Sequence, residues 1–161
     1  EVFLFSETIA NNISFGLTKM DFSKETIEAA AKNAAIYNNI MEFPDRFETF
    51  VGERGITLSG GQKQRISIAR AIIRSPQILI FDDCLSSVDT ETEEEILNNL
   101  KIIMQDKTSI IISHRVSSVK HADHIIILDE GRVVEEGKHA YLVDKKGIYF
   151  DLFQKQQLEN S

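Results

Sequence analysis

Hydrophobic and polar positions follow two different patterns along the chain, and the change comes near residue 76. Before it, apolar residues recur every three or four positions, which is the spacing of a helix with one buried face. After it, short continuous apolar runs alternate with helical segments, as in strands that a parallel sheet buries on both faces. The sequence therefore predicts an α/β fold: a parallel sheet with helices on its faces, preceded by a mostly helical region.

The predicted helices of the first half are bounded by polar caps, glycine or proline. They cover 8–15 with a stop at Gly16, Ser23 to about Ala35, Ile36 to Glu42 before Pro44, and a run that begins at Ser59 and stops before Pro76. A polar, glycine-containing connector at 45–57 separates the last two helices.

In the second half, apolar runs predict strands and amphipathic segments predict helices. The strands are Gln77 to Asp82, Thr108 to Ser113 and His124 to Leu128, and the last turns at Glu130-Gly131 into Arg132 to Glu135; the helices are Thr90 to about Met104, Val116 to Lys120, 139–145 and 148–157. Thr90 and Glu93 have the spacing of a capping box, so we expect Thr90 to cap its helix.

Composition narrows the classes of function. The 161 residues fit one domain, and the net charge of −7 argues against a nucleic-acid-binding surface as the main function. Cys84 is the only cysteine, so no disulfide can form within the chain, and we interpret it as a packing residue rather than a nucleophile. No apolar run approaches the ~20 residues that span a bilayer. The first residues resemble neither a signal peptide nor an initiator segment, which predicts a cut inside a domain.

Two glycines begin the last helix of the first half, in the sequence Leu58-Ser59-Gly60-Gly61-Gln62. Each glycine costs about 1 kcal/mol of helix stability relative to alanine. Bare amide groups at the positive end of a helix form an anion site, so one interpretation is a helix start that faces phosphate. The alternative is structural, because Ser59 and Gln62 have the spacing of a capping box. The local sequence leaves both interpretations open.

Two adjacent carboxylates, Asp82 and Asp83, end the first predicted strand. Ligands of α/β folds bind at this edge of the sheet, where an aspartate can hold Mg²⁺ beside nucleotide phosphates. Asp82 is therefore a candidate magnesium ligand, with capping of the next turn as the alternative. Asp83 could orient an attacking water as general base, or it could be a solvated turn residue.

His114 follows the second predicted strand and is expected at the same edge of the sheet as Asp82. This place favours a contact to a γ-phosphate, although a single histidine is more often structural. The sequence Ser86-Ser87-Val88-Asp89 comes directly after the carboxylates. It is either part of the same site or a loop that leads into the next helix.

Together these segments resemble the motifs of ATP-binding-cassette (ABC) ATPases, in the same order. Leu58 to Gln62 resembles the signature motif, Ile78 to Asp82 the Walker B strand, Ser86 to Asp89 the D-loop, and His114 the switch histidine. Further segments are similar to exporter-type cassettes: Val51 to Gly55 to their coupling connector, Thr8 to Gly16 to the region after their Q-loop, and Gly131 to His139 with Gly147-Ile148-Tyr149 to their tails. The resemblance covers nearly the whole chain.

The resemblance implies an ATP-hydrolysing, Mg²⁺-dependent domain of an exporter. It would have a RecA-like P-loop NTPase core, whose second half is expected at about 77–161, and a helical signature subdomain at about 8–76. In the family, two cassettes close head to tail on two ATP molecules. Ser59, Gly60, Gly61 and Gln62 would face the γ-phosphate of the ATP held by the partner cassette. Leu58, Ser87 and Asp89 are further residues expected to bind nucleotide.

The remaining implied roles concern the domain's own chemistry and its surroundings. Asp82 would bind Mg²⁺, and Asp83 and His114 would be catalytic. The domain would lie at the cytoplasmic face of a membrane, attached to the transmembrane domain of the transporter, and it would not bind nucleic acid. The transmembrane domain would also determine the transported substrate.

Two departures from the family pattern stand out. No Walker A motif is present: the nearest string, Gly55 to Gln62, lacks the lysine and follows no strand. We therefore expect the C-terminal part of a nucleotide-binding domain, with little ATPase activity by itself and with exposed strand edges that favour self-association. Asp83 stands where most members have glutamate. This indicates either the degenerate site of a heterodimer or a homodimer in which aspartate still works.

Two other functions fit parts of the pattern. ATPases of chromosome maintenance or DNA repair share a similar signature, but they have long coiled-coil insertions, and this chain has no heptad run. They also lack the exporter connector found here at 51–55. A non-catalytic module could, alternatively, supply only a signature helix to its partner.

Overall fold

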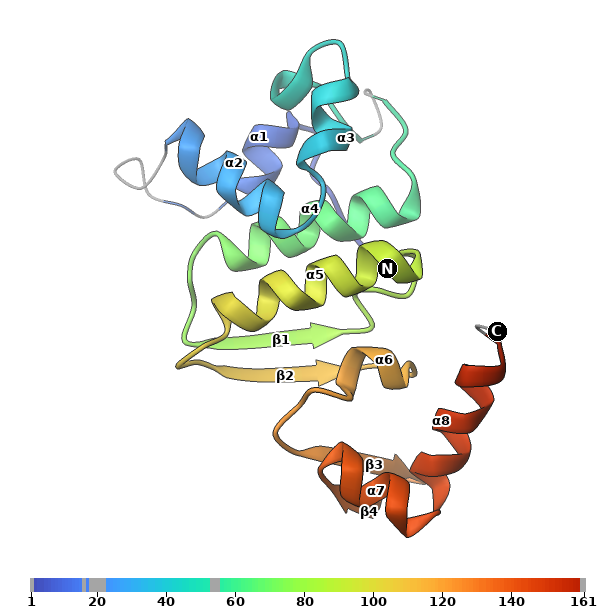
Figure 1. Cartoon of the computed structure of the whole chain (residues 1–161). Coiled ribbons are helices and arrows are strands. Elements are labelled where there is room, and N and C mark those ends of the chain that lie inside the picture. Colours follow the sequence, from blue (N-terminus) through green and yellow to red (C-terminus); the bar gives the residue numbers. More distant parts are fainter. Residues whose placement is uncertain (1, 16, 18–22, 53–55, 160–161) are drawn as a thin grey trace. The chain divides into compact units, whose positions relative to one another are not determined.

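The computed structural model of the chain describes residues 2–15, 17, 23–52 and 56–159. It divides into two compact units, residues 1–110 and 111–161, and each unit is described by itself. Figure 1 shows their helices and strands. The predicted stop at Gly16 and the part of the predicted connector at 53–55 lie outside the described residues.

The first unit is built around helix α4. Its elements are α1 (Ile9–Ile13), α2 (Lys24–Asn33), α3 (Tyr37–Glu42), a 3-10 turn (Arg46–Glu48), α4 (Gly60–Ile72), β1 (Ile78–Asp82), α5 (Thr90–Ile103) and the first three residues of β2 (Thr108–Ile112), because the boundary between the units falls within that strand. α1 and α2 pack on α4, and α5 packs on α2. Ile66, Ala69 and Ile72 are buried at helical spacing along α4, because they form its apolar stripe. The helices predicted for this half of the chain are confirmed, with ends that differ by a few residues.

β1 and β2 pair in a two-stranded sheet, and their arrows run in the same direction in Figure 1. Leu79 and Phe81 of β1 are buried, whereas Ile78 and Ile80 are each 62% exposed. Successive side chains of a strand point to opposite faces of the sheet. The described residues therefore cover one face of β1 and leave the other open, and the prediction that both faces are buried is wrong for this chain.

The starts of α2 and α5 test the predicted N-cap residues. Ser23 caps α2 as predicted, because its hydroxyl accepts a hydrogen bond from the Thr26 N–H at 3.1 Å. For α5 the prediction is wrong by one position. Asp89 is the N-cap, since its Oδ1 accepts the Thr92 N–H at 2.9 Å, and Thr90 is already the first helical residue.

The second unit is a β-hairpin with helices packed beside it. It contains α6 (Val116–Val119), β3 (Ile125–Asp129), β4 (Arg132–Gly137), α7 (His139–Lys145) and α8 (Ile148–Glu159). The predicted third strand is confirmed as β3, which pairs antiparallel with β4. Glu130 and Gly131 make the turn with φ of 46° and 74°, and such positive values are typical of short hairpin turns. The core of the unit consists of Val116, Ile125, Leu142 and Tyr149.

A buried asparagine ties the N-terminal segment to α4. The side chain of Asn12 has no exposed surface, and its Nδ2 donates to the carbonyls of Phe5 and Thr8 at 3.0 and 3.1 Å. Its Oδ1 accepts the Phe5 N–H at 2.9 Å. Arg70 of α4 donates to the same Oδ1 at 2.7 Å and to the Asn12 carbonyl at 2.8 Å. One side chain therefore satisfies backbone groups of the N-terminal segment and a guanidinium from α4.

Replacing Asn12 by alanine is expected to lower the free energy of unfolding by at least about 2 kcal/mol, because each buried polar group left without a partner costs about 1–3 kcal/mol. Asn11→Ala is the matched control, since the Asn11 side chain is exposed and donates to Glu7 at 3.1 Å. Urea unfolding of the two variants measures the difference. Equal losses in both would contradict the role given to Asn12.

Candidate functional site

The start of α4 is a closed capping box. The Ser59 hydroxyl accepts the Gln62 N–H at 3.2 Å, and the Gln62 side chain accepts the Ser59 N–H at 2.9 Å. Leu58 before them is buried, while Ser59 and Gly60 are exposed. The structural interpretation of Ser59 and Gln62 is therefore confirmed. Exposure at this helix start leaves the phosphate-facing interpretation in place as a prediction.

The two glycines of this start pack against the segment that follows β1. A Cβ placed on Gly61 would lie 2.8 Å from the carbonyl oxygen of Ser87, so the backbone would have to shift. A Cβ on Gly60 would meet only the side chain of Ser87, at 3.4 Å. Packing within this chain therefore requires glycine at position 61, because two backbone segments approach closely there. No local pattern signals this reason, because Ser87 is distant along the sequence.

Gln64 fixes the D-loop segment (Ser86 to Asp89) to α4. Gln64 is buried, its Nε2 donates to the Ser86 hydroxyl at 3.0 Å, and its Oε1 accepts the Ser87 N–H at 2.9 Å. The Ser86 hydroxyl donates in turn to the Asp83 carbonyl at 3.0 Å. Sequence reasoning missed Gln64, although its position one turn after the glycines places it on their face of the helix. The structure thus brings together the start of α4, the D-loop segment and the end of β1.

Asp82 ends β1, Asp83 begins the turn after it, and both side chains are exposed. The φ of 46° at Asp83 lies in the left-handed region, which aspartate adopts more readily than most residues. Among the described residues, no three His, Cys, Asp or Glu side chains are grouped so as to hold a metal ion by themselves. Magnesium beside a nucleotide needs one or two carboxylates, because phosphates and water supply the other ligands. Asp82 at the strand end fits that chemistry.

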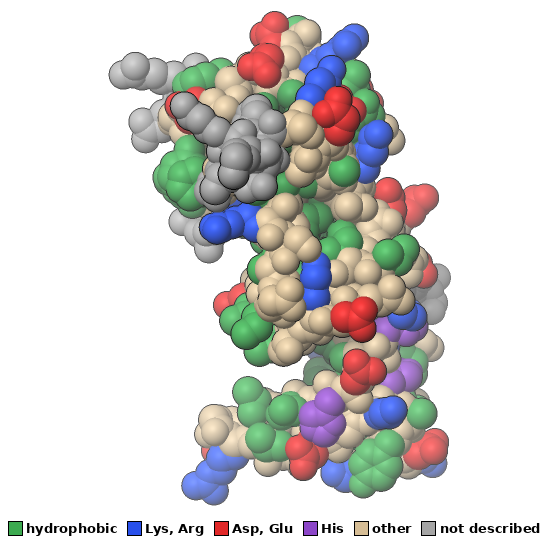
Figure 2. All heavy atoms as spheres, turned by 90° about the vertical axis from the view of Figure 1, so that its left-hand side faces the viewer, with side chains coloured by type: hydrophobic (Ala, Val, Ile, Leu, Met, Phe, Trp, Pro, Cys, Tyr) green, Lys and Arg blue, Asp and Glu red, His purple; other side chains and the backbone are tan. Residues whose placement is uncertain are grey.

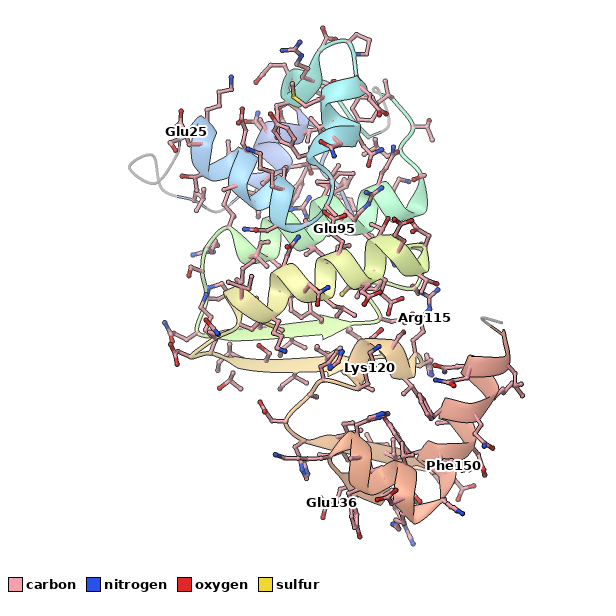
Figure 3. All side chains as sticks on the ribbon, in the orientation of Figure 1. Glu25, Glu95, Arg115, Lys120, Glu136 and Phe150 are labelled. Carbon is pink, nitrogen blue, oxygen red and sulfur yellow. The ribbon has the colours of Figure 1, made fainter. Side chains whose placement is uncertain are left out.

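Asp89 is engaged in capping α5. The hydrogen bond from the Thr92 backbone N–H is the main reason why the pKa of Asp89 lies below its ordinary value, and the positive charge of Arg65 adds to it. Arg65 donates to the Asn39 side chain at 2.9 Å. Burial lowers the pKa of Arg65, and the negative charges of Asp89 and of Glu95, labelled in Figure 3, oppose that change. The contact of Asp89 with ATP stays a prediction beside this observed role as a cap.

Cys84 follows the two carboxylates and is partly buried. Burial is the main cause that raises the pKa of Cys84 to about 11, and the negative charges of Asp83 and Asp82 act in the same direction. The thiol is therefore protonated at neutral pH, and the protonated form is a poor nucleophile. This environment agrees with the interpretation of Cys84 as a packing residue.

His114 belongs to the second unit, where it follows β2 and has an exposed side chain. Its backbone carbonyl accepts a hydrogen bond from Gln156 Nε2 at 2.7 Å. Arg115, labelled in Figure 3, separates it from Val116, the first residue of α6. Because His114 and Asp82 belong to different units, their meeting at one edge of the sheet stays a prediction.

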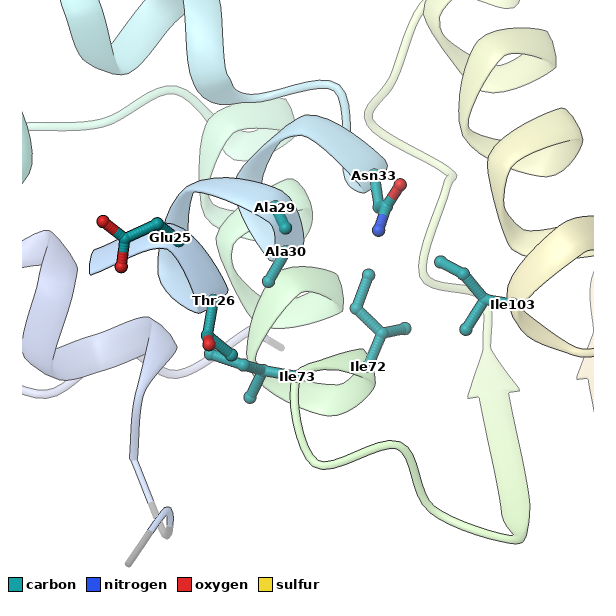
Figure 4. Close-up of a pocket in the computed structure, with 8 residues that line it drawn as sticks. All are labelled: Glu25, Thr26, Ala29, Ala30, Asn33, Ile72, Ile73 and Ile103. Atoms are coloured by element: carbon teal, nitrogen blue, oxygen red, sulfur yellow. The ribbon is translucent and has the colours of Figure 1, made fainter. Parts of the chain in front are cut away.

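A hollow of about 400 Å³ opens between α2 and the ends of α4 and α5, as the close-up in Figure 4 shows. It is lined by Glu25, Thr26, Ala29, Ala30, Asn33, Ile72, Ile73 and Ile103. Among the described residues that line it, none is a predicted site residue, and Glu25 has the one ionisable side chain. Acid–base catalysis in this hollow would therefore depend on Glu25 alone.

The surface carries charges of both signs. On the face of each unit drawn in Figure 2, basic and acidic side chains are interspersed, and no broad basic patch is seen there. This agrees with the net charge of −7. Within the described ranges, no helix has both the length and the apolar character needed to cross a membrane.

Comparisons with known proteins agree on one family. The family model described as "ABC transporter" matches residues 2–86. The chain is 51% identical over 156 residues to the uncharacterized ABC transporter ATP-binding protein YknU of Bacillus subtilis, across 97% of this chain and 26% of that protein. It is 46% identical over 157 residues to the multidrug resistance-like ATP-binding protein MdlA of Escherichia coli, across 98% of this chain and 26% of that protein.

A solved structure is also similar. A bacterial Atm1-family ABC exporter with ATP bound matches with a TM-score of 0.88 and 42% identity, over 96% of this chain and 27% of that one. This likeness confirms the predicted α/β fold, with its parallel sheet and helices. The chain spans about a quarter of the length of these relatives.

Gly61→Ala is expected to lower the free energy of unfolding, because the new Cβ would press on the Ser87 carbonyl. This loss should outweigh the gain in helix propensity, which is at most about 1 kcal/mol. Gly60→Ala is the matched control, and its stability should be unchanged or higher. Urea unfolding compares the two variants. A Gly61 variant as stable as the wild type would show that the contact relaxes without cost.

Proposed function

Because this chain belongs to the ABC transporter family, we propose that it forms part of the ATP-binding and ATP-hydrolysing component of an exporter. In that role, binding and hydrolysis of ATP drive transport across a membrane. The observation that carries the proposal is the set of hydrogen bonds through Gln64 and Ser86, which join the start of α4 to the carboxylate end of β1. Relatives named as ATP-binding proteins of ABC transporters support it.

ATP and Mg²⁺ are the proposed ligands of the site. Asp82 would bind Mg²⁺, which supplies positive charge beside the phosphates. Asp83 would orient the attacking water as general base, and the imidazole of His114 would donate a hydrogen bond to the γ-phosphate. These groups would act by positioning and by electrostatic stabilisation, because phosphoryl transfer asks for little covalent chemistry from the protein.

A second cassette is the proposed partner, arranged head to tail as a homodimer or a heterodimer. The start of α4, from Leu58 to Gln62, would face the ATP of that partner, together with Ser87 and Asp89. Gly61 packs directly on Ser87, so the two segments would meet the partner's nucleotide as one body. Attachment to a transmembrane domain would hold the pair at the cytoplasmic face of the membrane.

Competing functions receive less support. The relatives reported above are transporter proteins, which gives no support to an ATPase of chromosome maintenance or DNA repair. A cassette that only lends its α4 start to a partner differs from the main proposal in one respect, which is the hydrolytic competence of Asp83.

Asp82→Asn is expected to reduce ATP turnover of the full natural protein by about 10²-fold or more, because the lost metal contact is worth several kcal/mol of charge stabilisation. Phosphate release under saturating Mg²⁺-ATP measures the effect. Asp123→Asn is the matched control, since Asp123 is another exposed aspartate and lies outside the proposed site. Wild-type turnover in the Asp82 variant would refute the proposed magnesium site.

Asp83→Glu separates the two forms of the proposal. If the site is degenerate, the longer side chain should raise turnover at this site by roughly 10–10²-fold, because a misplacement of about 1 Å costs that much. If aspartate is already competent, the wild type should be active and the variant no faster. Single-turnover measurements on the full natural protein distinguish these outcomes.

A further inference from the structure

Helix α8 is fixed at its first turn by a carboxylate from the hairpin. The side chain of Glu135 in β4 is buried and accepts the N–H groups of Ile148 and Tyr149 at 3.2 and 3.0 Å. A side chain at Gly147 would overlap this carboxylate. Such a contact is favourable, because the first amides of a helix have no partner inside it and lie at its positive end.

One face of α8 packs on the core of the second unit. Tyr149 is 1% exposed, and Phe153, one turn later, packs against the same core beside Val116 and Leu142. Gln156 comes three residues after Phe153 and so lies on the same face of the helix. The packing of α8 therefore aims Gln156 at the backbone that leads into α6.

Gln156 holds that backbone on both sides of Arg115. Its Nε2 donates to the His114 carbonyl at 2.7 Å, and its Oε1 accepts the Val116 N–H at 2.7 Å. The Arg115 N–H donates to the Ser113 hydroxyl at 3.0 Å. Two side chains thus fix three consecutive residues through their backbone, while the side chain of His114 stays exposed.

One of the two bonds has a purely structural explanation. α6 is a single turn of four residues, too short to be stable by itself, and its N-cap Arg115 makes no side-chain cap bond. The Oε1 of Gln156 supplies an acceptor for the first amide of that turn. The bond from Nε2 to the His114 carbonyl has no part in capping, because a cap needs only the acceptor.

We propose that Gln156 is a positioning residue for His114: it fixes the backbone of His114 so that the exposed imidazole is held in place for its contact with phosphate. This inference rests on the proposed role of His114 in ATP hydrolysis. A misplacement of about 1 Å at a catalytic group can cost roughly 10²-fold in rate, so a hydrogen bond that sets backbone position has a measurable consequence.

Two variants of Gln156 separate positioning from capping. Gln156→Ala removes both bonds, whereas Gln156→Glu keeps an acceptor for the Val116 N–H and loses the donor to the His114 carbonyl. In the full natural protein, both variants are expected to lower kcat roughly 10–10²-fold and to leave KM for ATP within about twofold. Gln154→Ala is the matched control, because Gln154 is an exposed glutamine of the same helix.

Amide hydrogen exchange at Val116 measures the cap directly. Gln156→Ala should speed exchange there, and Gln156→Glu should leave it slow. A Gln156→Glu variant with slow exchange and reduced kcat supports the proposal, since its cap is intact. The same variant with wild-type kcat overturns it and leaves capping as the function of Gln156.

A double variant tests whether Gln156 acts through His114. In a His114→Ala background, Gln156→Ala should cause no further loss of kcat, because the group that it positions is already gone. An equal loss in both backgrounds would overturn the proposal. If His114→Ala itself keeps full turnover, the proposed role of His114 fails and this inference with it. If His114→Ala loses turnover and both Gln156 variants keep it, only this inference fails.

Discussion

The close approach of the Ser87 backbone to Gly61 is the constraint on which the site in the first unit depends. It excludes a side chain at Gly61 and sets the D-loop segment against the first turn of α4. At that distance one buried side chain, Gln64, reaches both Ser86 and Ser87. The segment held in this way starts after the carboxylate end of β1 and finishes at Asp89, which caps α5. This backbone contact therefore lies where two helix starts and a strand end come together.

Helices and strands could be predicted from the sequence, because each has a local pattern of residues. The packing around them could not. Helical spacing and apolar runs are properties of a few neighbouring residues. Exposure of Ile78 and Ile80 depends on what packs against the strand, and an apolar run has the same pattern in either case. The start of α5 shows a finer limit. Asp89 and Thr90 are both good cap residues, and only the place of the Thr92 N–H in space distinguishes them.

The residues of the candidate site also differ in whether the sequence could predict them. Asp82, Asp83 and the glycine start of α4 could be found because they stand at the ends of recognisable patterns. Gln64 and Gln156 could not, because each makes its decisive bonds to residues far away in sequence, and a glutamine in an amphipathic helix is ordinarily a surface residue. Both are amides that bridge a helix to a loop. The two loops of the candidate site are thus held by residues that belong to no recognisable motif.

The hydrogen bonds from the first amides of α8 to Glu135 affect how the helix can move. From Ile148 to Gln156 the helix rises about 12 Å, at about 1.5 Å per residue. If the helix moves as a rigid body, a tilt of about 5° at the hairpin displaces its far end by about 1 Å, and a shift of that size would matter for the proposed role of His114. Hydrogen bonds at the two ends of α8 therefore connect the β3–β4 hairpin to the backbone of His114, so a tilt of the hairpin would be passed along the helix to that residue.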